Sequence, residues 1–448
     1  MYFEINTNSE LLNLNIMKED FLQFIWKHGL FRKIDLKTTD GKPLEIISSG
    51  QLNSDSGPDF FNAKIRIGDT TWAGNIEIHQ KSSHWYRHRH NTDAAYDNVI
   101  LHVVELNDSP VLIKSQTLPT LVISYPPEIL ENYEQLLRSA KWIACEDQIS
   151  EYDPFLIRFW FSSLMIERLQ SKTGDILNIL EQTKNNWNET FYQLLARNFG
   201  MKTNALPFEM LAKSLPLQIL SKHKNDLFQL EALLFGQSGL LNETLLGDDY
   251  YLSLRNEYSY LYKKYNLSGI ESHLWKFMRL RPINFPTIRI AQLAMLIHHS
   301  SALFSHILET EDLEELRKLF DVSASGYWDT HYSFNKISKN NHSKKLGDTA
   351  FNNLLINTIV PLLFVYGDQH LDQAMKDRAL MMLEKLAPES NQIIRKWSEL
   401  GIESRTAFET QALLQLKNNY CEHKKCLNCQ LGAKIISSAK PSTHESTV

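Results

Sequence analysis

Hydrophobic and polar residues follow two different patterns along the chain, and the change lies near residue 130. Before it, short runs rich in apolar and β-branched residues are separated by turn-forming residues, which predicts strands. A helical stripe of apolar residues precedes these runs, and a polar, histidine-rich stretch interrupts them after residue 79. The predicted helix covers residues 19–31, and the predicted strands cover 44–48, 60–67, 71–79, 99–106 and 120–125. This order predicts a small mixed α/β domain.

From about residue 150 to 415, apolar residues recur at helical spacing almost throughout, with breaks at prolines and glycines. We therefore expect an α+β protein with four parts. They are a mixed α/β domain at 1–130, a mostly α-helical domain at 131–415, a cysteine-rich metal-binding segment at 416–436 and a disordered polar tail at 437–448. The predicted helices cover residues 154–169, 190–199, 227–235, 274–280, 289–307, 312–319, 349–366, 371–386 and 407–418.

Composition narrows the class of protein. Of 448 residues, 43% are hydrophobic and 22% are charged, which is typical of a folded globular protein. The net charge of −5 excludes a generally basic nucleic-acid coat but is compatible with a local basic groove. The first ten residues lack the basic-then-apolar order of a signal peptide. The longest apolar stretch, 354–366, is too short to cross a membrane, so we expect a buried helix there and a cytoplasmic protein.

The densest chemistry lies between residues 53 and 102, where two acidic residues occupy strand positions. Asp59 follows a Gly-Pro turn at the start of one predicted strand, and Glu77 lies near the end of the next. Strand side chains alternate, so Glu77 and His79 project from one face. A turn at residues 68–69 lays the two strands side by side, and Asp59 and Glu77 then come within reach of one cation.

Two carboxylates suit Mg²⁺ or Mn²⁺, which prefer oxygen ligands and retain several waters. Such an ion polarises a phosphoryl oxygen and lowers the pKa of a bound water. We therefore expect Asp59 and Glu77 to hold the ion, and His79 or Lys81 to assist the attacking water.

This arrangement resembles the PD-(D/E)XK, or restriction-endonuclease-like, nuclease superfamily. The resemblance covers roughly residues 15–130 and consists of Pro58-Asp59, then Glu77-x-His79 on the next strand, within an α-β-β-β-α-β order. It implies a restriction-endonuclease-like domain and cleavage of phosphodiester bonds. His79 stands where the superfamily usually carries lysine, and Lys81 lies on the same predicted strand face.

A basic and aromatic patch follows the carboxylates in HWYRHRHNTD, residues 84–93. Phosphate contacts and base stacking both use such residues, so we predict nucleic-acid contacts by Trp85, Arg87, His88 and His90. Alternatively, His84 and His88 stand four residues apart and could bind Zn²⁺ together with Asp93, as in a zinc hydrolase.

The four cysteines form a second candidate centre. Cys421, Cys426 and Cys429 lie within nine residues, and Cys145 stands alone near the junction of the two patterns. Clustered cysteines in a cytosolic protein indicate metal. A 4Fe–4S cluster and Zn²⁺ both remain open, and His423 could replace Cys145 as a zinc ligand. The pattern resembles iron–sulfur nucleases of helicase–nuclease and CRISPR-adaptation systems, which place one cysteine before and three after the nuclease core, whereas Cys145 follows the predicted core here.

The chain as a whole resembles a bacterial family described as a domain of unknown function. The residues that carry this resemblance are GPDF, WAGNIEIH, AYDNVILHVV, RPINFP and the C-terminal cysteines. Two hypotheses follow. The first is a metal-dependent nuclease, or a nuclease-like protein that binds nucleic acid. The second is a catalytically inactive nuclease-fold scaffold or interaction protein with a structural Fe–S or Zn site.

Overall fold

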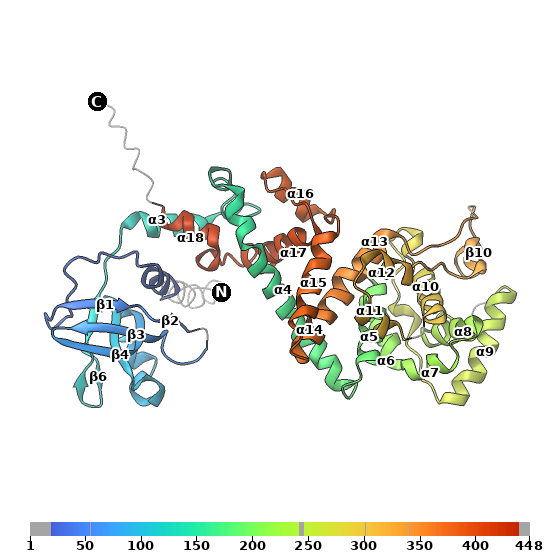
Figure 1. Ribbon diagram of the computed structural model, residues 1–448, viewed down its shortest axis with the longest axis horizontal. Coiled ribbons are helices and arrows are strands. Elements are labelled where there is room, and N and C mark those ends of the chain that lie inside the picture. Colours follow the sequence, from blue (N-terminus) through green and yellow to red (C-terminus); the bar gives the residue numbers. More distant parts are fainter. Residues whose placement is uncertain (1–18, 54, 242–245, 301, 340, 439–448) are drawn as a thin grey trace, which may run out of the picture. The chain divides into compact units, whose positions relative to one another are not determined.

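The computed structural model describes residues 19–438 except 54, 242–245, 301 and 340 (Figure 1). The tail predicted at 437–448 therefore lies outside the described residues from 439 onward. The chain divides into two compact units, and we describe each by itself. The first unit is Met1–Trp160 with Leu416–Val448, and the second is Phe161–Gln415. The boundary thus lies 30 residues later than the one expected from the sequence, and the cysteine segment belongs to the first unit.

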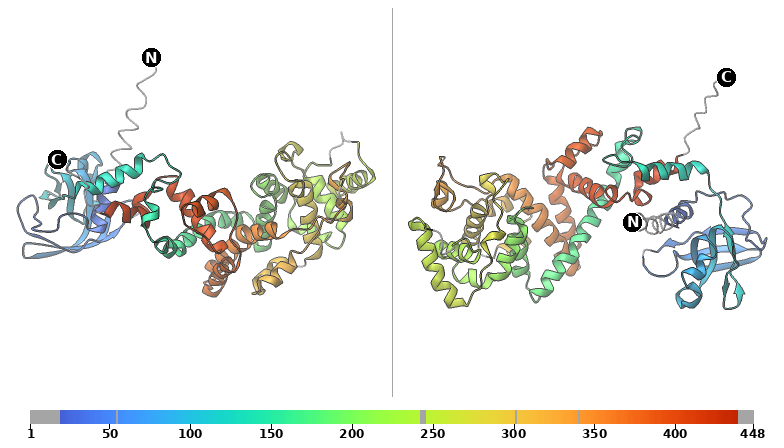
Figure 2. Two further views of the ribbon diagram at one scale, coloured as in Figure 1. Left: turned by 90° about the horizontal axis from the view of Figure 1, so that it is seen from above. Right: turned by 180° about the vertical axis from the view of Figure 1, so that it is seen from behind.

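A curled mixed sheet forms the centre of the first unit (Figures 1 and 2). Its order is β1-β3-β4-β5-β8, with β2 added beside β3. The pairs β1–β3 and β3–β4 are antiparallel, whereas β4–β5 and β5–β8 are parallel. The strands are β1 (Leu44–Ser48), β2 (Gln51–Leu52), β3 (Phe60–Ile67), β4 (Thr70–Lys81), β5 (Val99–Leu106) and β8 (Thr120–Val122), and β6 (Leu112–Ile113) and β7 (Gln116–Thr117) form a separate small hairpin.

The long strands match the sequence pattern closely. β1, β3 and β5 begin and end at the predicted residues, and β4 is one residue longer at its start and two at its end. Phe60, Ala63, Ile65 and Ile67 are buried along β3, as expected of a half-buried strand. A glycine is needed at Gly74, because a Cβ atom there would lie 2.5 Å from Ile100 Cγ2 in β5.

A short helical crossover joins the parallel strands β4 and β5. It contains α2 (His84–Arg87) and the 3₁₀ turns His90–Thr92 and Ala94–Tyr96. The crossover is anchored by Trp85, which is 0% exposed and packs in an apolar cluster with Tyr96 and Val99. The prediction that Trp85 stacks on nucleic-acid bases is therefore wrong, because the ring is enclosed by the core.

The C-terminal segment packs on α3 (Pro127–Arg138) within the first unit. A π-helical turn at Leu416–Cys421 and a 3₁₀ turn at Cys426–Asn428 lead into α18 (Gln430–Ser437). The amide of Asn132 in α3 donates to the backbone carbonyls of Ile435, Ile436 and Ser438. Helices α3 and α18 lie side by side in Figures 1 and 2. Residues about 300 apart in sequence are thus joined in one unit.

The second unit is helical, as predicted, with some differences at helix boundaries. The predicted helix 274–280 is wrong, since only a 3₁₀ turn at Ser272–Leu274 forms, and the predicted helix 289–307 is divided into α10 and α11. Its helices are α4 (Pro154–Gln182, which begins in the first unit), α5 (Trp187–Phe199), α6 (Ala205–Ser214), α7 (Leu217–Lys222), α8 (Leu227–Gln237), α9 (Asp249–Tyr265), α10 (Pro286–His299), α11 (Leu303–Glu309), α12 (Leu313–Leu319), α13 (Asp348–Leu354), α14 (Val360–Gln369), α15 (Gln373–Lys385), α16 (Gln392–Glu399) and α17 (Ala407–Gln415), with the short strands β9 (His331–Ser333) and β10 (Lys336–Ile337).

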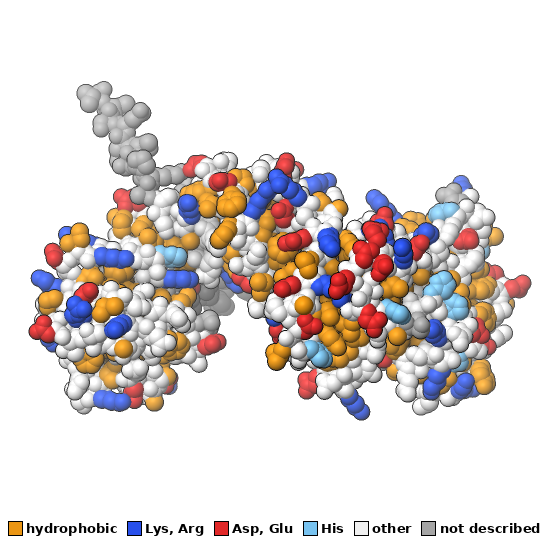
Figure 3. Space-filling model, in the orientation of Figure 1, with side chains coloured by type: hydrophobic (Ala, Val, Ile, Leu, Met, Phe, Trp, Pro, Cys, Tyr) orange, Lys and Arg blue, Asp and Glu red, His pale blue; other side chains and the backbone are white. Residues whose placement is uncertain are grey.

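One helical stretch of the described residues, Asp348–Gln369, is long and apolar enough to cross a membrane. Its apolar window is 78% buried inside the protein, so this stretch is a core helix, as predicted for residues 354–366. On the face shown in Figure 3, basic and acidic side chains are intermixed over both units, in keeping with the small net charge.

Candidate metal centre

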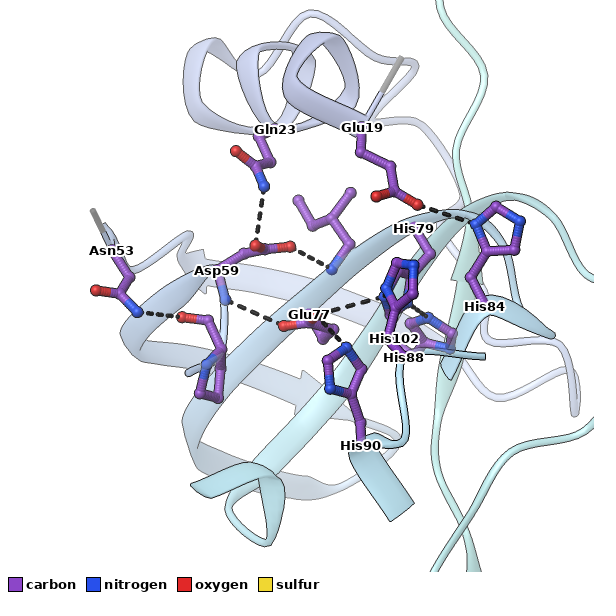
Figure 4. A network of polar contacts seen from close by, with 12 residues as sticks. Glu19, Gln23, Asn53, Asp59, Glu77, His79, His84, His88, His90 and His102 are labelled. Atoms are coloured by element: carbon purple, nitrogen blue, oxygen red, sulfur yellow. Dashed lines mark hydrogen bonds and ion pairs between the residues drawn. The ribbon is translucent and has the colours of Figure 1, made fainter. Parts of the chain in front are cut away.

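The two acidic residues that the sequence singled out converge across neighbouring strands (Figure 4). Asp59 immediately precedes β3, and its backbone N–H donates to Glu77 Oε2 at 3.1 Å. The backbone N–H of Ile78 in β4 donates to Asp59 Oδ2 at 2.8 Å. Each carboxylate is therefore fixed by the backbone of the other strand, and the side chains meet on the face opposite Ile76 and Ile78.

The helix at residues 19–28 supplies two groups that the sequence analysis did not single out. The side-chain amide of Gln23 donates to Asp59 Oδ1 at 2.8 Å. Glu19 Oε1 lies 2.9 Å from His84 Nδ1. Glu19 and Gln23 stand four residues apart, so the sequence alone places both side chains on one face of this helix. This polar pair was not recognised as part of a site, because the apolar stripe of the helix indicated only that the helix packs against the core.

A histidine cluster surrounds the free oxygen of Glu77. Glu77 Oε1 lies 3.1 Å from His90 Nε2 and 3.5 Å from His79 Nε2. His79 Nε2 lies 3.2 Å from His88 Nδ1, and His79 Nδ1 lies 2.8 Å from His102 Nε2 (Figure 4). Ligand atoms of His79, His88 and His90 are all within 4.8 Å of one another, as are those of Glu19, His84 and His88.

Burial dominates the electrostatics of this centre. Burial, and then the neighbouring Glu77 carboxylate, raises the pKa of Asp59 well above its usual value. Burial raises the pKa of Glu77 to about 8, and the Glu19 carboxylate adds to this. Burial and the other imidazoles lower the pKa of His79 well below its usual value, and burial lowers the pKa of His102 to about 3. Crowded buried carboxylates beside neutral imidazoles form a site that favours a bound cation.

The remaining predicted residues fall into different places. Lys81 is exposed at the end of β4, whereas His79 is buried beside Glu77. Arg87 and His88 are exposed on the crossover, so they are accessible to a ligand. Asp93 accepts a hydrogen bond from the backbone N–H of Ala95, and the third group beside His84 and His88 is Glu19 instead. The predicted zinc set of His84, His88 and Asp93 is thus not the set that the fold brings together.

A groove of about 620 Å³ lies beside Gln23, and its lining includes the acidic residues Asp20 and Glu422 as well as basic residues. Gln23, which holds Asp59, and Lys27 line it from the helix at 19–28. His423, Lys424 and Lys425 line it from the loop between the cysteines, and all three are exposed. Lys424 Nζ also donates to the carbonyl of Leu137 in α3, which fixes this loop. Of this loop the sequence analysis named only His423, as an alternative zinc ligand, because the position of the loop relative to Asp59 depends on the fold.

The four cysteines come together in the first unit, and all four are free thiols. Burial, and then Cys429 and Cys426, raises the pKa of Cys145 to about 12, and burial raises the pKa of Cys426 to about 12. The pKa of Cys421 is raised by burial and then by each of the other three cysteines. Four neighbouring cysteines that are each at least partly buried are held either as protonated thiols or as metal ligands.

The backbone around the cysteines is shaped for close approach to sulfur. The N–H of Gly432 donates to Cys429 Sγ at 3.5 Å, and a Cβ atom at Gly432 would lie 2.3 Å from the carbonyl oxygen of Cys426. Within the described part of the chain, no three of the four Sγ atoms lie within 4.8 Å of one another. The thiols are therefore spaced more widely than around a tetrahedral Zn²⁺, where Zn–S bonds of about 2.3 Å place them about 3.8 Å apart.

The fold and its sites define a mixed α/β domain with a buried carboxylate–histidine centre and a four-cysteine centre, followed by a helical unit. The chain belongs to the family described as "Protein of unknown function (DUF2851)", whose model matches residues 19–392. The predicted membership of a family of this kind is confirmed. Searches of the curated proteins and of the solved structures found no match. The matched range includes Glu19, Asp59, Glu77 and the histidine cluster.

Proposed function

We propose that the protein is a metal-dependent nuclease with a restriction-endonuclease-like first unit. The observation that carries the proposal is the convergence of Asp59 and Glu77 across two adjacent strands. The order of helix, three antiparallel strands, helical crossover and parallel strand supports it, because the resemblance places its acidic motif on the second and third strands of that order.

Asp59 and Glu77 would hold Mg²⁺ or Mn²⁺, which activates a water and polarises the scissile phosphate. His79 takes the place usual for lysine. A buried imidazole with a lowered pKa is neutral, so it can assist the attacking water by orienting a neighbouring group and not by carrying a positive charge. It cannot neutralise charge in the transition state as a lysine does. Phosphate charge would then be met by the metal and by exposed basic groups such as Arg87.

The basic groove supports a nucleic-acid substrate. Lys27 on the helix and His423, Lys424 and Lys425 on the loop offer positive or hydrogen-bonding groups beside the acidic Asp20 and Glu422, and Gln23 of the same helix donates to Asp59. Such a groove attracts a phosphate backbone without reading its sequence.

The cysteines would hold a 4Fe–4S cluster, which their wide spacing favours over Zn²⁺. The role proposed for this cofactor is structural. It would join Cys145, which follows α3, to the loop that carries Lys424 and Lys425, and would thereby fix one wall of the groove.

Cleavage by the full-length, anaerobically purified protein tests the proposal. Single- and double-stranded DNA and RNA are incubated with Mg²⁺ or Mn²⁺, with EDTA as the metal-free control. We expect metal-dependent cleavage that falls at least about 100-fold in Asp59→Asn. Asp55→Asn makes the same change at an exposed position of the same loop and should leave cleavage intact.

The second candidate function is a non-enzymatic protein that binds nucleic acid in the same groove, and the observation that favours it is His79 in place of lysine. Absence of cleavage from wild-type protein with full metal content would support it over the nuclease, provided that the protein still binds the nucleic acid.

A further inference from the structure

We propose that Glu77, His79, His88 and His90 bind a first-row transition-metal ion such as Zn²⁺, Mn²⁺ or Fe²⁺, in addition to the hard ion assigned to Asp59 and Glu77. The ion itself requires only the geometry described below. Its role as a second catalytic ion rests on the proposed nuclease function.

The spacing of the donor atoms carries the proposal. Ligand atoms of His79, His88 and His90 lie within 4.8 Å of one another, and Glu77 adjoins two of these histidines. The printed separations are His90 Nε2 to Glu77 Oε1 at 3.1 Å, His79 Nε2 to His88 Nδ1 at 3.2 Å, and His79 Nε2 to Glu77 Oε1 at 3.5 Å. Metal–ligand bonds of about 2.1 Å place neighbouring ligand atoms about 3.0 Å apart at right angles and about 3.4 Å apart in a tetrahedron. The observed separations therefore match the edges of a coordination polyhedron.

Hydrogen bonding does not account for the contact between His90 and Glu77. His90 Nε2 is buried and has no hydrogen bond within the described part of the chain, although Glu77 Oε1 is only 3.1 Å away. His90 Nε2 and Glu77 Oε1 are close but are not aligned for a hydrogen bond. Two ligands of the same metal ion have this arrangement. A buried polar atom without a partner is otherwise destabilising, so an ion at this point removes a penalty.

A second layer of contacts orients the imidazoles, as metal-binding histidines require. His79 Nδ1 lies 2.8 Å from His102 Nε2, so a proton on His79 Nδ1 leaves the Nε2 lone pair of His79 directed at the proposed ion. The ring of His90 stacks on Tyr96 with centroids 3.8 Å apart. Tyr96 in turn packs against the buried ring of Trp85, which explains why this tryptophan is enclosed in the core.

The donor set selects the metal. Three imidazole nitrogens and one carboxylate oxygen suit Zn²⁺, Mn²⁺ or Fe²⁺, whereas Mg²⁺ prefers an all-oxygen environment. His88 is exposed, so one side of the site opens to solvent and leaves room for a water or a phosphate oxygen. Glu77 directs Oε1 at the histidines while its Oε2 accepts the backbone N–H of Asp59, so this one carboxylate would serve both proposed ions, as in a two-metal phosphodiesterase centre.

Cobalt binding to the metal-depleted full-length protein tests the site without reference to cleavage. Co²⁺ bound by histidine and carboxylate gives visible d–d bands, whereas Co²⁺ bound by cysteine adds an intense thiolate charge-transfer band. We expect one equivalent of thiolate-free Co²⁺ per chain at the histidines, and Asp59→Asn, which removes the hard-ion site, should isolate it. The double variant His88→Ala/His90→Ala should bind this equivalent at least 10-fold more weakly, with the thiolate band unchanged.

Two controls make the result decisive. His273→Ala removes an exposed histidine of the second unit and should leave cobalt binding unaltered. Asp59→Asn should retain the thiolate-free Co²⁺ at the histidines. Loss of cleavage in this variant and loss of the histidine-bound ion are therefore separate outcomes. Wild-type protein without thiolate-free cobalt, or a double variant that is folded by circular dichroism and binds cobalt as tightly as the wild type, would overturn the proposal.

Discussion

Replacing Glu77 by glutamine should stabilise the metal-free protein while removing its metal response. Burial raises the pKa of Glu77 from 4.5 to about 8, a difference of 3.5 units. At 1.36 kcal/mol per unit, the ionised side chain costs the first unit of the order of 5 kcal/mol above pH 8. Glutamine has the same shape, can accept the hydrogen bond from Asp59 N–H and does not ionise.

The pH dependence fixes the sign of the effect. Because the folded-state pKa is raised, the stability linked to the protonated Glu77 is fully present below pH 4.5 and is lost as the pH rises through about 8. Glu77→Gln should therefore match the wild type near pH 4.5 and exceed it near pH 8. With Mn²⁺ at 100 times its dissociation constant, the wild type should gain about 2.7 kcal/mol and the variant much less.

Amide hydrogen exchange along β4, compared between variants at the same pH, measures this local stability. The matched control is Glu45→Gln, an exposed carboxylate on β1, which should change stability by no more than about 0.5 kcal/mol. A Glu77→Gln protein that is less protected than the wild type at pH 8 without metal would refute the reasoning, because Glu77 would then be a structural anion rather than a ligand awaiting a cation.

Three further predictions concern the other features. The Cys426→Ser protein should lose its iron or zinc, measured by elemental analysis, and its thermal unfolding midpoint should fall, measured by calorimetry. The Asn428→Ser protein, changed in the same loop, should keep both the metal and the midpoint. Lys27→Ala/Lys425→Ala should weaken binding of single-stranded DNA and reduce the salt slope by about 2, and an unchanged slope would exclude the groove. Burial raises the pKa of Glu231 in the second unit to about 7. As the pH rises from 4.5 to above 7, ionisation of this side chain should lower the stability of the second unit by about 3 kcal/mol. Glu231→Gln should abolish that loss.

Local sequence patterns predicted the sheet well because each strand is specified by its own residues. Runs rich in apolar and β-branched residues, with turn-forming residues on either side, defined β1, β3 and β5 to the residue. The first and last residues of the helices in the second unit were harder to predict. Residues 274–280 carry helical spacing, yet tertiary contacts such as the indole N–H of Trp275 to the carbonyl of Ser238 hold them in an irregular path.

The candidate site divides in the same way. Asp59 and Glu77 could be paired from the sequence, because one hairpin connects their strands. The histidine cluster could not be assembled, because it depends on how the crossover folds back over β4 and β5. Trp85 was assigned to the surface for the same reason: its polar neighbours in the sequence indicate exposure, whereas the fold directs the ring into the core. Glu19 and the basic loop at 423–425 reach the site only through long-range packing.

Anomalous X-ray diffraction from crystals of the full-length protein soaked in Mn²⁺ tests the central claim most directly. The account predicts a peak about 2.1 Å from an oxygen of both Asp59 and Glu77. Side chains that keep only their bonds to Gln23 and the strand amides, with no peak between them at saturating manganese, would contradict it.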